Sequence, residues 1–160
     1  MSDVDMFLKL DGVLGESKDV KNTVEMQIDG FRLHADTPRD AFTNLAAGAA
    51  RMSTLTIHGK IEQATAKLFD KTVNHTKISK ATLTCRKAGK VPLDFLIVEL
   101  SEVLVMRVEI GDLGAGEGDG FPPCEFDLSY GKLTVKSQGQ TSTGGGTGFL
   151  QFDFSLMANK

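Results

Sequence analysis

The longest hydrophobic pattern in the chain runs from Leu93 to Ile110 and has a period of two residues. This period is typical of a β-strand, in which successive side chains point to opposite faces. The apolar even-numbered positions from Leu96 to Ile110 share one predicted face, which only Glu102 interrupts. A straight strand of this length would span roughly 60 Å, so we expect a bulge or bend near Ser101 and Glu102.

Further segments with the same alternation surround this strand. The stretch from Val24 to Leu33 keeps one apolar face only if Asp29 and Gly30 form a bulge, and Phe126 to Val135 reads as one strand or a hairpin arm. The predicted strands are Val4–Leu10, Val24–Leu33, Ser53–His58, Ile78–Arg86, Leu93–Ile110, Phe126–Val135 and Leu150–Leu156. They predict a mainly β fold, a compact antiparallel β-barrel of two packed sheets with about seven or eight strands.

One segment has the period of a helix instead. Apolar residues from Ile61 to Asn74 form a single stripe, which predicts one α-helix on the flank of the barrel. Thr65 would cap a shorter version of this helix. The glycine-rich segments 111–120 and 139–148 predict loops.

A long extended loop is predicted between His34 and Met52. The segment has no sustained period, and Pro38, Gly48 and many small residues interrupt it. A short alanine-rich helix from Phe42 to Met52, packed on its own barrel, is the alternative.

Composition limits the classes of function. The 160 residues suit one domain spanning 1–160, and a net charge of −3 with scattered Lys and Arg gives no reason to expect nucleic acid. Charged positions within Leu93 to Ile110 argue against membrane insertion. Because no signal peptide is recognisable at the start, we expect a protein made in the cytoplasm, with export by another route left open.

No catalytic, metal or cofactor site is predicted. His34, His58 and His75 have no spaced partner, and Cys85 and Cys124 show no metal-ligand spacing. Cys85 shares a strand face with apolar neighbours and is expected to be buried. Neither glycine run has the Lys-Ser/Thr ending of a phosphate-binding loop. We therefore expect the function to depend on surfaces rather than on catalysis.

Two segments resemble a known family. Val4 to Asp19 (VDMFLKLDGVLGESKD) and Arg86 to Val105 (RKAGKVPLDFLIVELSEVLV) resemble signatures of the haemolysin-coregulated protein (Hcp) family, the tube subunit of bacterial type VI secretion systems. The closing FDFSLMANK is similar to the last strand of that family. Relatives usually have tryptophan where Phe31 and Leu33 stand, whereas this chain contains no Trp.

The resemblance implies a structural protein without enzymatic activity or cofactor. It implies hexameric rings that enclose a channel, stack into a tube and carry effector proteins out of the cell. The implied partners are other copies of the chain, the sheath, spike and baseplate proteins, and effector cargo. A secreted effector variant of the family and a monomeric ligand-binding β-barrel are the alternatives.

Two groups of residues are candidates for these contacts. The resemblance implies that the long loop contacts neighbouring subunits or rings, through Asp36, Thr37, Pro38, Arg39, Phe42 and Leu45. The polar face of the strand Val24–Leu33 is expected to line the channel, through Glu25, Gln27 and Arg32. We expect Arg32 to contact cargo and discriminate it by charge; the alternative is that it faces outer solvent.

Overall fold

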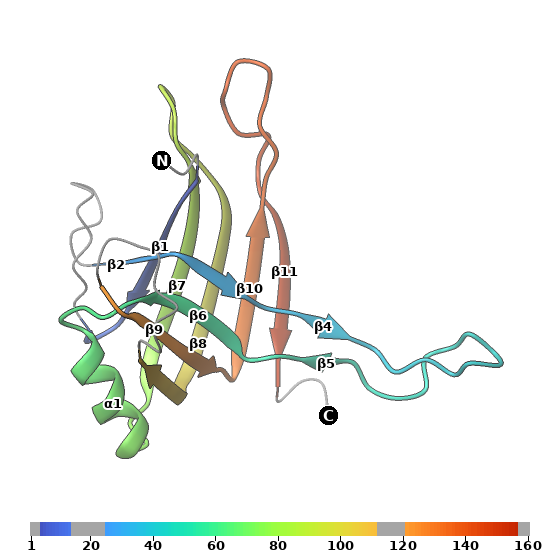
Figure 1. Ribbon diagram of the computed structural model, residues 1–160. Coiled ribbons are helices and arrows are strands. Elements are labelled where there is room, and N and C mark those ends of the chain that lie inside the picture. The colour runs from blue at the N-terminus through green and yellow to red at the C-terminus, as the bar shows by residue number, and fades with distance from the viewer. Residues whose placement is uncertain (1–3, 14–24, 112–120, 157–160) are drawn as a thin grey trace.

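A computed structural model describes residues 4–13, 25–111 and 121–156. The described residues contain eleven strands and one helix (Figure 1). The elements are β1 (Val4–Leu10), β2 (Met26–Ile28), β3 (Gly30–Arg32), β4 (Ala35–Asp36), β5 (Arg51–Met52), β6 (Leu55–Lys60), α1 (Thr65–Val73), β7 (Ile78–Lys87), β8 (Leu93–Ile110), β9 (Pro123–Ser129), β10 (Lys132–Ser137) and β11 (Leu150–Ser155). The predicted class, mainly β with two packed sheets and one helix, is confirmed.

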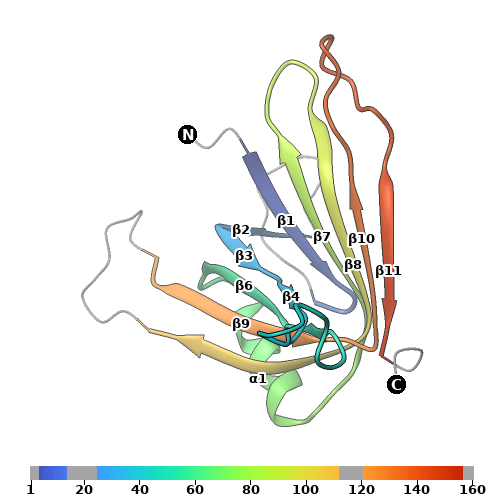
Figure 2. The same cartoon turned by 90° about the vertical axis from the view of Figure 1, so that its right-hand side faces the viewer.

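Nine of these strands form two antiparallel sheets that share β8, and β4 and β5 pair separately. The first sheet has the order β2-β1-β7-β8-β10-β11, and the second has the order β8-β9-β6-β3. Figure 2 shows the strands of the two sheets crossing, with the first sheet steep and the second running below and across it. Hydrogen-bonded neighbours follow one another in the order β2-β1-β7-β8-β9-β6-β3. Because the first and last strands of this order, β2 and β3, are consecutive in the chain, the two sheets wrap into a barrel-like fold.

The strand β8 turns from one sheet into the other at Glu102. The predicted bounds and the predicted bend are both confirmed, and Glu102 has a φ of 54°. This left-handed residue shifts the alternation, because Val98 and Leu100 are buried before it and Val103 and Val105 after it. The predicted face was therefore wrong immediately after Glu102, at the next two even-numbered positions.

The displaced residues are Leu104 and Met106, which were predicted to share the inner face. Met106 is 58% exposed, and a second register shift falls between Val105 and Arg107. That bulge places Met106 between two paired residues and turns Val108 back toward the core.

Two predicted strands are each divided between the sheets. Met26 and Ile28 are buried on β2, and after Asp29 the half-buried Phe31 points inward from β3, so the predicted change of parity is confirmed, although it comes from a break between two strands and not from a bulge. β2 pairs with β1 and β3 pairs with β6. The segment Phe126–Val135 likewise divides into β9 and β10, which pair with opposite halves of β8 rather than with each other. These divisions, together with β4 and β5, explain why there are more strands than predicted.

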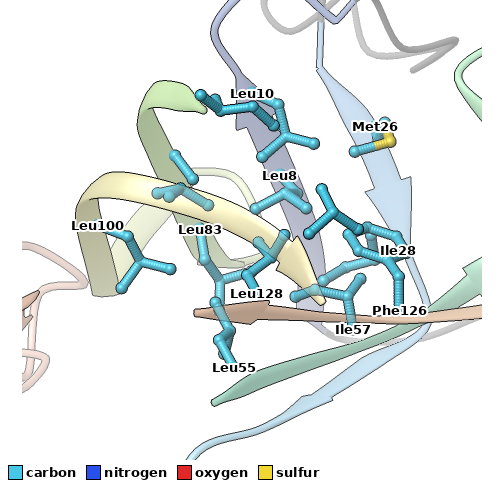
Figure 3. Close-up of a cluster of buried hydrophobic side chains, with 14 of the residues drawn as sticks. Leu8, Leu10, Met26, Ile28, Leu55, Ile57, Leu83, Leu100, Phe126 and Leu128 are labelled. Atoms are coloured by element: carbon cyan, nitrogen blue, oxygen red, sulfur yellow. The ribbon is translucent and has the colours of Figure 1, made fainter. Parts of the chain in front are cut away.

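The core lies between the two sheets. Leucine, isoleucine and valine side chains from both sheets meet there, and Leu8, Leu83, Leu55 and Leu128 have no exposed surface (Figure 3). Cys85 is buried in this core, as predicted, and burial raises the pKa of its thiol to about 11. Burial at this density is the main stabilising contribution to such a fold.

The helix α1 is shorter than the stripe from Ile61 to Asn74 predicted. It begins at Thr65, as in the shorter version, and packs Leu68 against the sheets. Thr65 does not cap it: Ala64 is the N-cap, and the Thr65 hydroxyl accepts a hydrogen bond from the Glu62 backbone at 3.0 Å. This hydrogen bond closes a turn over residues 62–65, so the helix begins at Thr65 and not at Ile61. No helix in the described ranges is long and apolar enough to cross a membrane.

Candidate functional site

The outer side of the second sheet carries a continuous group of polar side chains, which we call the charged face. Inward positions on β6 and β9 are apolar and buried, so the alternate residues of these strands point outward. The charged face consists of Arg32, Thr56, His58, Lys60, Arg107, Glu109, Glu125 and Asp127.

Arg107 is the centre of the charged face. Its Nε donates to Asp127 at 2.9 Å, its Nη1 to Glu109 at 2.6 Å, and its Nη2 to Glu125. The hydrogen bonds that it donates to Asp127 and then to Glu125 raise the pKa of the Arg107 guanidinium above its usual value. The planar guanidinium with its fixed fork of donors suits such a set of carboxylates. Arg107 thus ties β8 to β9 on the outer surface.

Asp127 extends this network to β6 and β3. Its carboxylate accepts a hydrogen bond from Thr56 at 2.8 Å, and the register places Arg32 beside Thr56. Burial raises the pKa of Asp127, but hydrogen bonds from Arg107 and Thr56 outweigh it, so that the pKa lies below its ordinary value. The charge of Arg32 acts in the same direction. The row across the four strands therefore holds the carboxylate of Asp127 between the positive charges of Arg107 and Arg32, with Thr56 between Asp127 and Arg32.

The structure separates the residues predicted to line a channel. Arg32 lies exposed on the charged face, at the end of β3. Gln27 is also exposed, but it lies on β2 of the first sheet, opposite Phe7 of β1. Glu25 is half-buried just before β2. Arg32 is therefore the predicted residue that belongs to the four-stranded outer surface.

The loop from Ala35 to Met52 is a β-ribbon, which we call the arm. β4 pairs with β5, Asp36 forms an ion pair with Arg51 at 2.9 Å, and Arg39 bridges to Ala46. In Figure 1 the arm leads away from both sheets to a tip. The predicted extension is present, whereas the alternative of an alanine-rich helix from Phe42 to Met52 is wrong, because the segment is paired as a ribbon.

The tip of the arm has a defined turn. The Asp40 carboxylate accepts hydrogen bonds from the backbone of Phe42 at 2.8 Å and of Thr43 at 3.0 Å. These two bonds, Thr43 first, hold the pKa of Asp40 below its usual value. Asn44 follows with a φ of 59° and accepts a bond from the Arg39 side chain. The turn holds Phe42 in solvent, 99% exposed, with Leu45 66% exposed.

The remaining loop candidates lie along the two strands of the arm. Asp36 is tied to Arg51, Thr37 is exposed, and the Pro38 carbonyl accepts a bond from Ala47 at 2.7 Å. The sequence thus located the arm but missed its ribbon, because side chains exposed on both faces leave no hydrophobic period.

A groove of about 430 Å³ lies at the base of the arm, where no feature of the sequence had predicted one. Met52, Tyr130, Phe154 and Leu156 provide its apolar lining, and the Tyr130 hydroxyl donates to the Ser53 carbonyl at 2.7 Å. The groove contains residues from three distant segments, and for that reason no local motif predicts it.

Histidine and cysteine side chains form no further chemical site in the described part of the chain. His58 lies 3.5 Å from Glu125 on the charged face, a contact that sequence spacing could not reveal. Among the described residues, no three His, Cys, Asp or Glu side chains are arranged to hold a metal ion. Cys85 and Cys124 are both buried and unbridged. The predicted loop 111–120 lies mostly outside the described residues.

These features define a protein that presents an ordered charged surface and a hydrogen-bonded arm. Comparison with known proteins identifies the class. The family model described as type VI secretion system effector, Hcp, matches residues 7–136. Protein hcp1 of Pseudomonas aeruginosa is 29% identical over 144 residues, which cover 88% of this chain and 87% of the relative.

Solved structures agree with this match. A type six secretion system protein superposes with a TM-score of 0.87 at 26% identity and covers 98% of both chains. Hcp1 from Salmonella typhimurium gives a TM-score of 0.78 at 25% identity, covering 99% of both chains. The chain belongs to the Hcp family of type VI secretion proteins, as the two sequence signatures indicated.

Proposed function

We propose that this protein is the structural tube subunit of a type VI secretion system, without enzymatic activity. Its copies form hexameric rings that stack into a channel and carry effector proteins out of the cell. The observation that carries this proposal is the end-to-end agreement of the fold with a type VI secretion protein, at a TM-score of 0.87 over 98% of both chains. Export then needs no signal peptide, since the tube itself is expelled.

The second sheet supports ring formation. Its two outer strands, β3 and the C-terminal half of β8, each pair with one strand only among the described residues. Open strand edges favour pairing with another chain. Because the two edges belong to different parts of the surface, a contact between them is heterologous, and heterologous contacts close into rings when the rotation allows.

The charged face supports the channel. A wide channel with an apolar lining would expose more hydrophobic surface than proteins tolerate in water. The charged face instead presents ion pairs between β8 and β9, with His58 of β6 and Arg32 of β3 beside them, so we assign it to the channel wall. Arg32 contacts cargo there and discriminates it by charge, with Gln27 and Glu25 at the neighbouring β2.

The arm supports contacts between subunits or rings. Its exposed residues Asp36, Thr37, Arg39, Phe42 and Leu45 and the half-buried Pro38 are held on a hydrogen-bonded ribbon away from the barrel. A rigid projection loses little conformational entropy when it docks. The further partners are the sheath, spike and baseplate proteins and effector cargo.

The cavity in the barrel interior does not support the alternative of a ligand-binding barrel. The cavity lined by Met26, Leu68 and Phe126 has a volume of about 10 Å³. Such a space holds about one water molecule. That part of the core therefore has no room for a ligand.

Electron microscopy of negatively stained protein tests the ring, together with a mass measurement in solution. Rings with a mass several times the 17.2 kDa of one chain are expected. A monodisperse monomer at high protein concentration, in low and moderate salt, contradicts the proposal.

Charge reversal tests the channel wall. Arg32→Glu should leave the rings intact, because no apolar contact is lost, and should reduce the amount of cargo that co-purifies. Lys67→Glu, which reverses a charge on the exposed side of α1, is the matched control. Equal cargo binding by both intact variants removes Arg32 from recognition.

A further inference from the structure

Phe42 is the most exposed large hydrophobic side chain among the described residues. It is 99% exposed at the tip of the arm, where Asp40 fixes the turn and Arg39 bonds to Asn44 at 3.0 Å. An aromatic ring in this position contacts water on all sides, although burying it would remove about 150–250 Å² of surface. The turn therefore presents an aromatic knob that has no partner among the described residues.

The groove at the base of the arm has the complementary shape and chemistry. Its lining combines two aromatic rings, Tyr130 and Phe154, with the flexible side chains of Met52 and Leu156. Aromatic rings favour edge-to-face contacts with one another, and methionine adapts to irregular surfaces. At about 430 Å³ the groove is in the size range of pockets that bind small molecules, so it has room for one aromatic side chain.

The arm cannot place its own tip in this groove. The groove includes residues 50–52 at the base of the arm, whereas β4–β5 pairing and the Arg39–Ala46 bridge keep the ribbon extended. Figure 1 shows the ribbon leading away from that base. A partner for Phe42 of this kind must therefore belong to a second copy of the chain.

We propose that Phe42 of one copy seats in the groove formed by Met52, Tyr130, Phe154 and Leu156 of another copy. This inference rests on the proposed assembly into rings and stacked rings, and it adds the receiving site for the arm. Because knob and groove are different surfaces, the contact is heterologous and repeats from copy to copy.

Charged groups of opposite sign lie beside the two surfaces. Asp40 places a carboxylate beside Phe42, and Arg51, which is 69% exposed and also forms the ion pair with Asp36, places a guanidinium at the rim of the groove. Opposite charges at the rim of a contact steer association and fix its orientation. A second copy of the chain is therefore a better occupant than an unrelated apolar segment.

The contact is a component of an assembly interface. Stable interfaces bury about 1,200–2,000 Å² in total, which is more than one aromatic ring provides. Each copy would make the contact twice, once through its tip and once through its groove, in addition to other contacts of the ring. A buried central aromatic side chain is typical of residues that dominate interface energy.

Cysteine cross-linking tests the docking while Phe42 stays in place. One full-length chain carries Thr43→Cys next to the knob, and a second, larger tagged chain carries Thr54→Cys in the lining of the groove. The native Cys85 and Cys124 are each 2% exposed and should not interfere. After mixing and mild oxidation, we expect a covalent heterodimer, which the size tag distinguishes from homodimers.

Two controls accompany this mixture. A Lys67→Cys chain replaces the Thr54→Cys chain and places the thiol on exposed α1, where no heterodimer is expected. Adding Phe42→Ala to the Thr43→Cys chain should abolish the cross-link. Absence of the heterodimer, equal cross-linking to Lys67→Cys, or a cross-link that survives Phe42→Ala each overturns the proposal.

Microscopy of the same samples separates the docking from the tube function. Rings without the heterodimer refute the docking and leave the tube function standing, whereas a monomer in all samples refutes both.

A concentration series provides an independent measure of the same contact. Phe42→Ala should raise the concentration for half-assembly about tenfold or more, as expected for a central aromatic contact. Phe42→Leu keeps an apolar knob and should change it by less than about threefold. Equal assembly of the Ala variant and the natural protein refutes the docking.

Discussion

The barrel and the arm of this protein are ordered by different interactions. In the barrel, side chains such as Leu8, Leu83 and Leu128 are fully buried between two sheets. In the arm nearly every residue is exposed, and order comes from ribbon pairing, an Asp36–Arg51 ion pair and the Asp40 turn. The barrel is therefore stabilised by burial of its own surface, whereas the arm keeps its apolar side chains available for contacts outside the chain.

The largest expected effect is a truncation in the barrel. Leu83 lies on β7 between Leu8 and Val98 of the neighbouring strands and has no exposed surface. Leu83→Ala should lower the free energy of unfolding by about 2–5 kcal/mol, since it removes buried surface and leaves a cavity. Urea denaturation measures the change.

Leu45→Ala in the arm is the matched control for that truncation. Leu45 is 66% exposed, so its replacement should change stability by less than about 0.5 kcal/mol. A loss at Leu45 comparable to that at Leu83 would show that the arm belongs to the core after all.

The difference in burial between the barrel and the arm explains which elements could be predicted from the sequence. The bounds of β8 and β1 were predicted to the residue, because alternating burial imposes a two-residue period on the sequence. The inner face of β8 was wrong at Leu104 and Met106, since the left-handed Glu102 shifts the alternation until the bulge at Met106 restores it. The arm ribbon was missed because burial acts on neither of its faces.

The turn between β9 and β10 tests the corner of the barrel, with an intermediate effect. A Cβ atom on Gly131 would overlap the Glu102 carboxylate and approach Glu102 Cβ to 3.2 Å. Gly131→Ala should therefore destabilise the fold by about 1–3 kcal/mol. Thermal unfolding measures the change, with Gly30→Ala as control, since no atom lies within 4 Å of that position.

Glu102 provides the compensating change. Glu102→Gly removes the side chain that the added methyl group of Gly131→Ala would displace, and glycine suits the φ of 54°. In the Gly131→Ala background, Glu102→Gly should restore most of the lost thermal stability. If it does not, overlap with Glu102 is not the cause of the loss.

The charged face predicts a smaller effect that depends on pH. Since the pKa of Asp127 is lowered in the folded protein, its stabilisation is present above the ordinary value of 3.8 and is lost as the pH falls through the lowered pKa. Asp127→Asn should cost about 1 kcal/mol near neutral pH, as expected for a partly exposed network. The difference from the natural protein should shrink in acid, in a denaturation series that runs from neutral pH to below the ordinary carboxyl pKa.

The same Asp→Asn change on the arm is the control for the general effect of removing one negative charge. Asp36→Asn removes an exposed ion pair with Arg51, each partner being about half or more exposed, and should have little effect on stability. A pH-independent loss for Asp127→Asn would contradict the assignment of the effect to its carboxylate.

The charged face also shows how far a candidate site is predictable. The outward positions of Arg107 and Glu109 follow from alternation, and the same pattern turned Arg32 away from the core, while the family resemblance favoured the channel for its strand. Their partners Glu125 and Asp127 lie on another strand, and only the register of β8 with β9 brings them together. Sequence patterns predict the face that a side chain shares, whereas the neighbours across strands depend on pairing.

The smallest expected effect on the barrel is that of removing the arm. Deleting Thr37 to Ala47 takes away the tip and most of the ribbon but none of the buried core residues. The free energy of unfolding should change by less than about 0.5 kcal/mol, because surface loops contribute little burial and shortening them changes loop entropy only slightly. Assembly into rings or stacked rings, measured by sedimentation and microscopy, should be weakened. If the deleted protein fails to fold as a monomer, the arm is part of the core, and the difference between the two regions does not hold. If it folds and assembles like the natural protein, the contacts between copies lie entirely on the barrel.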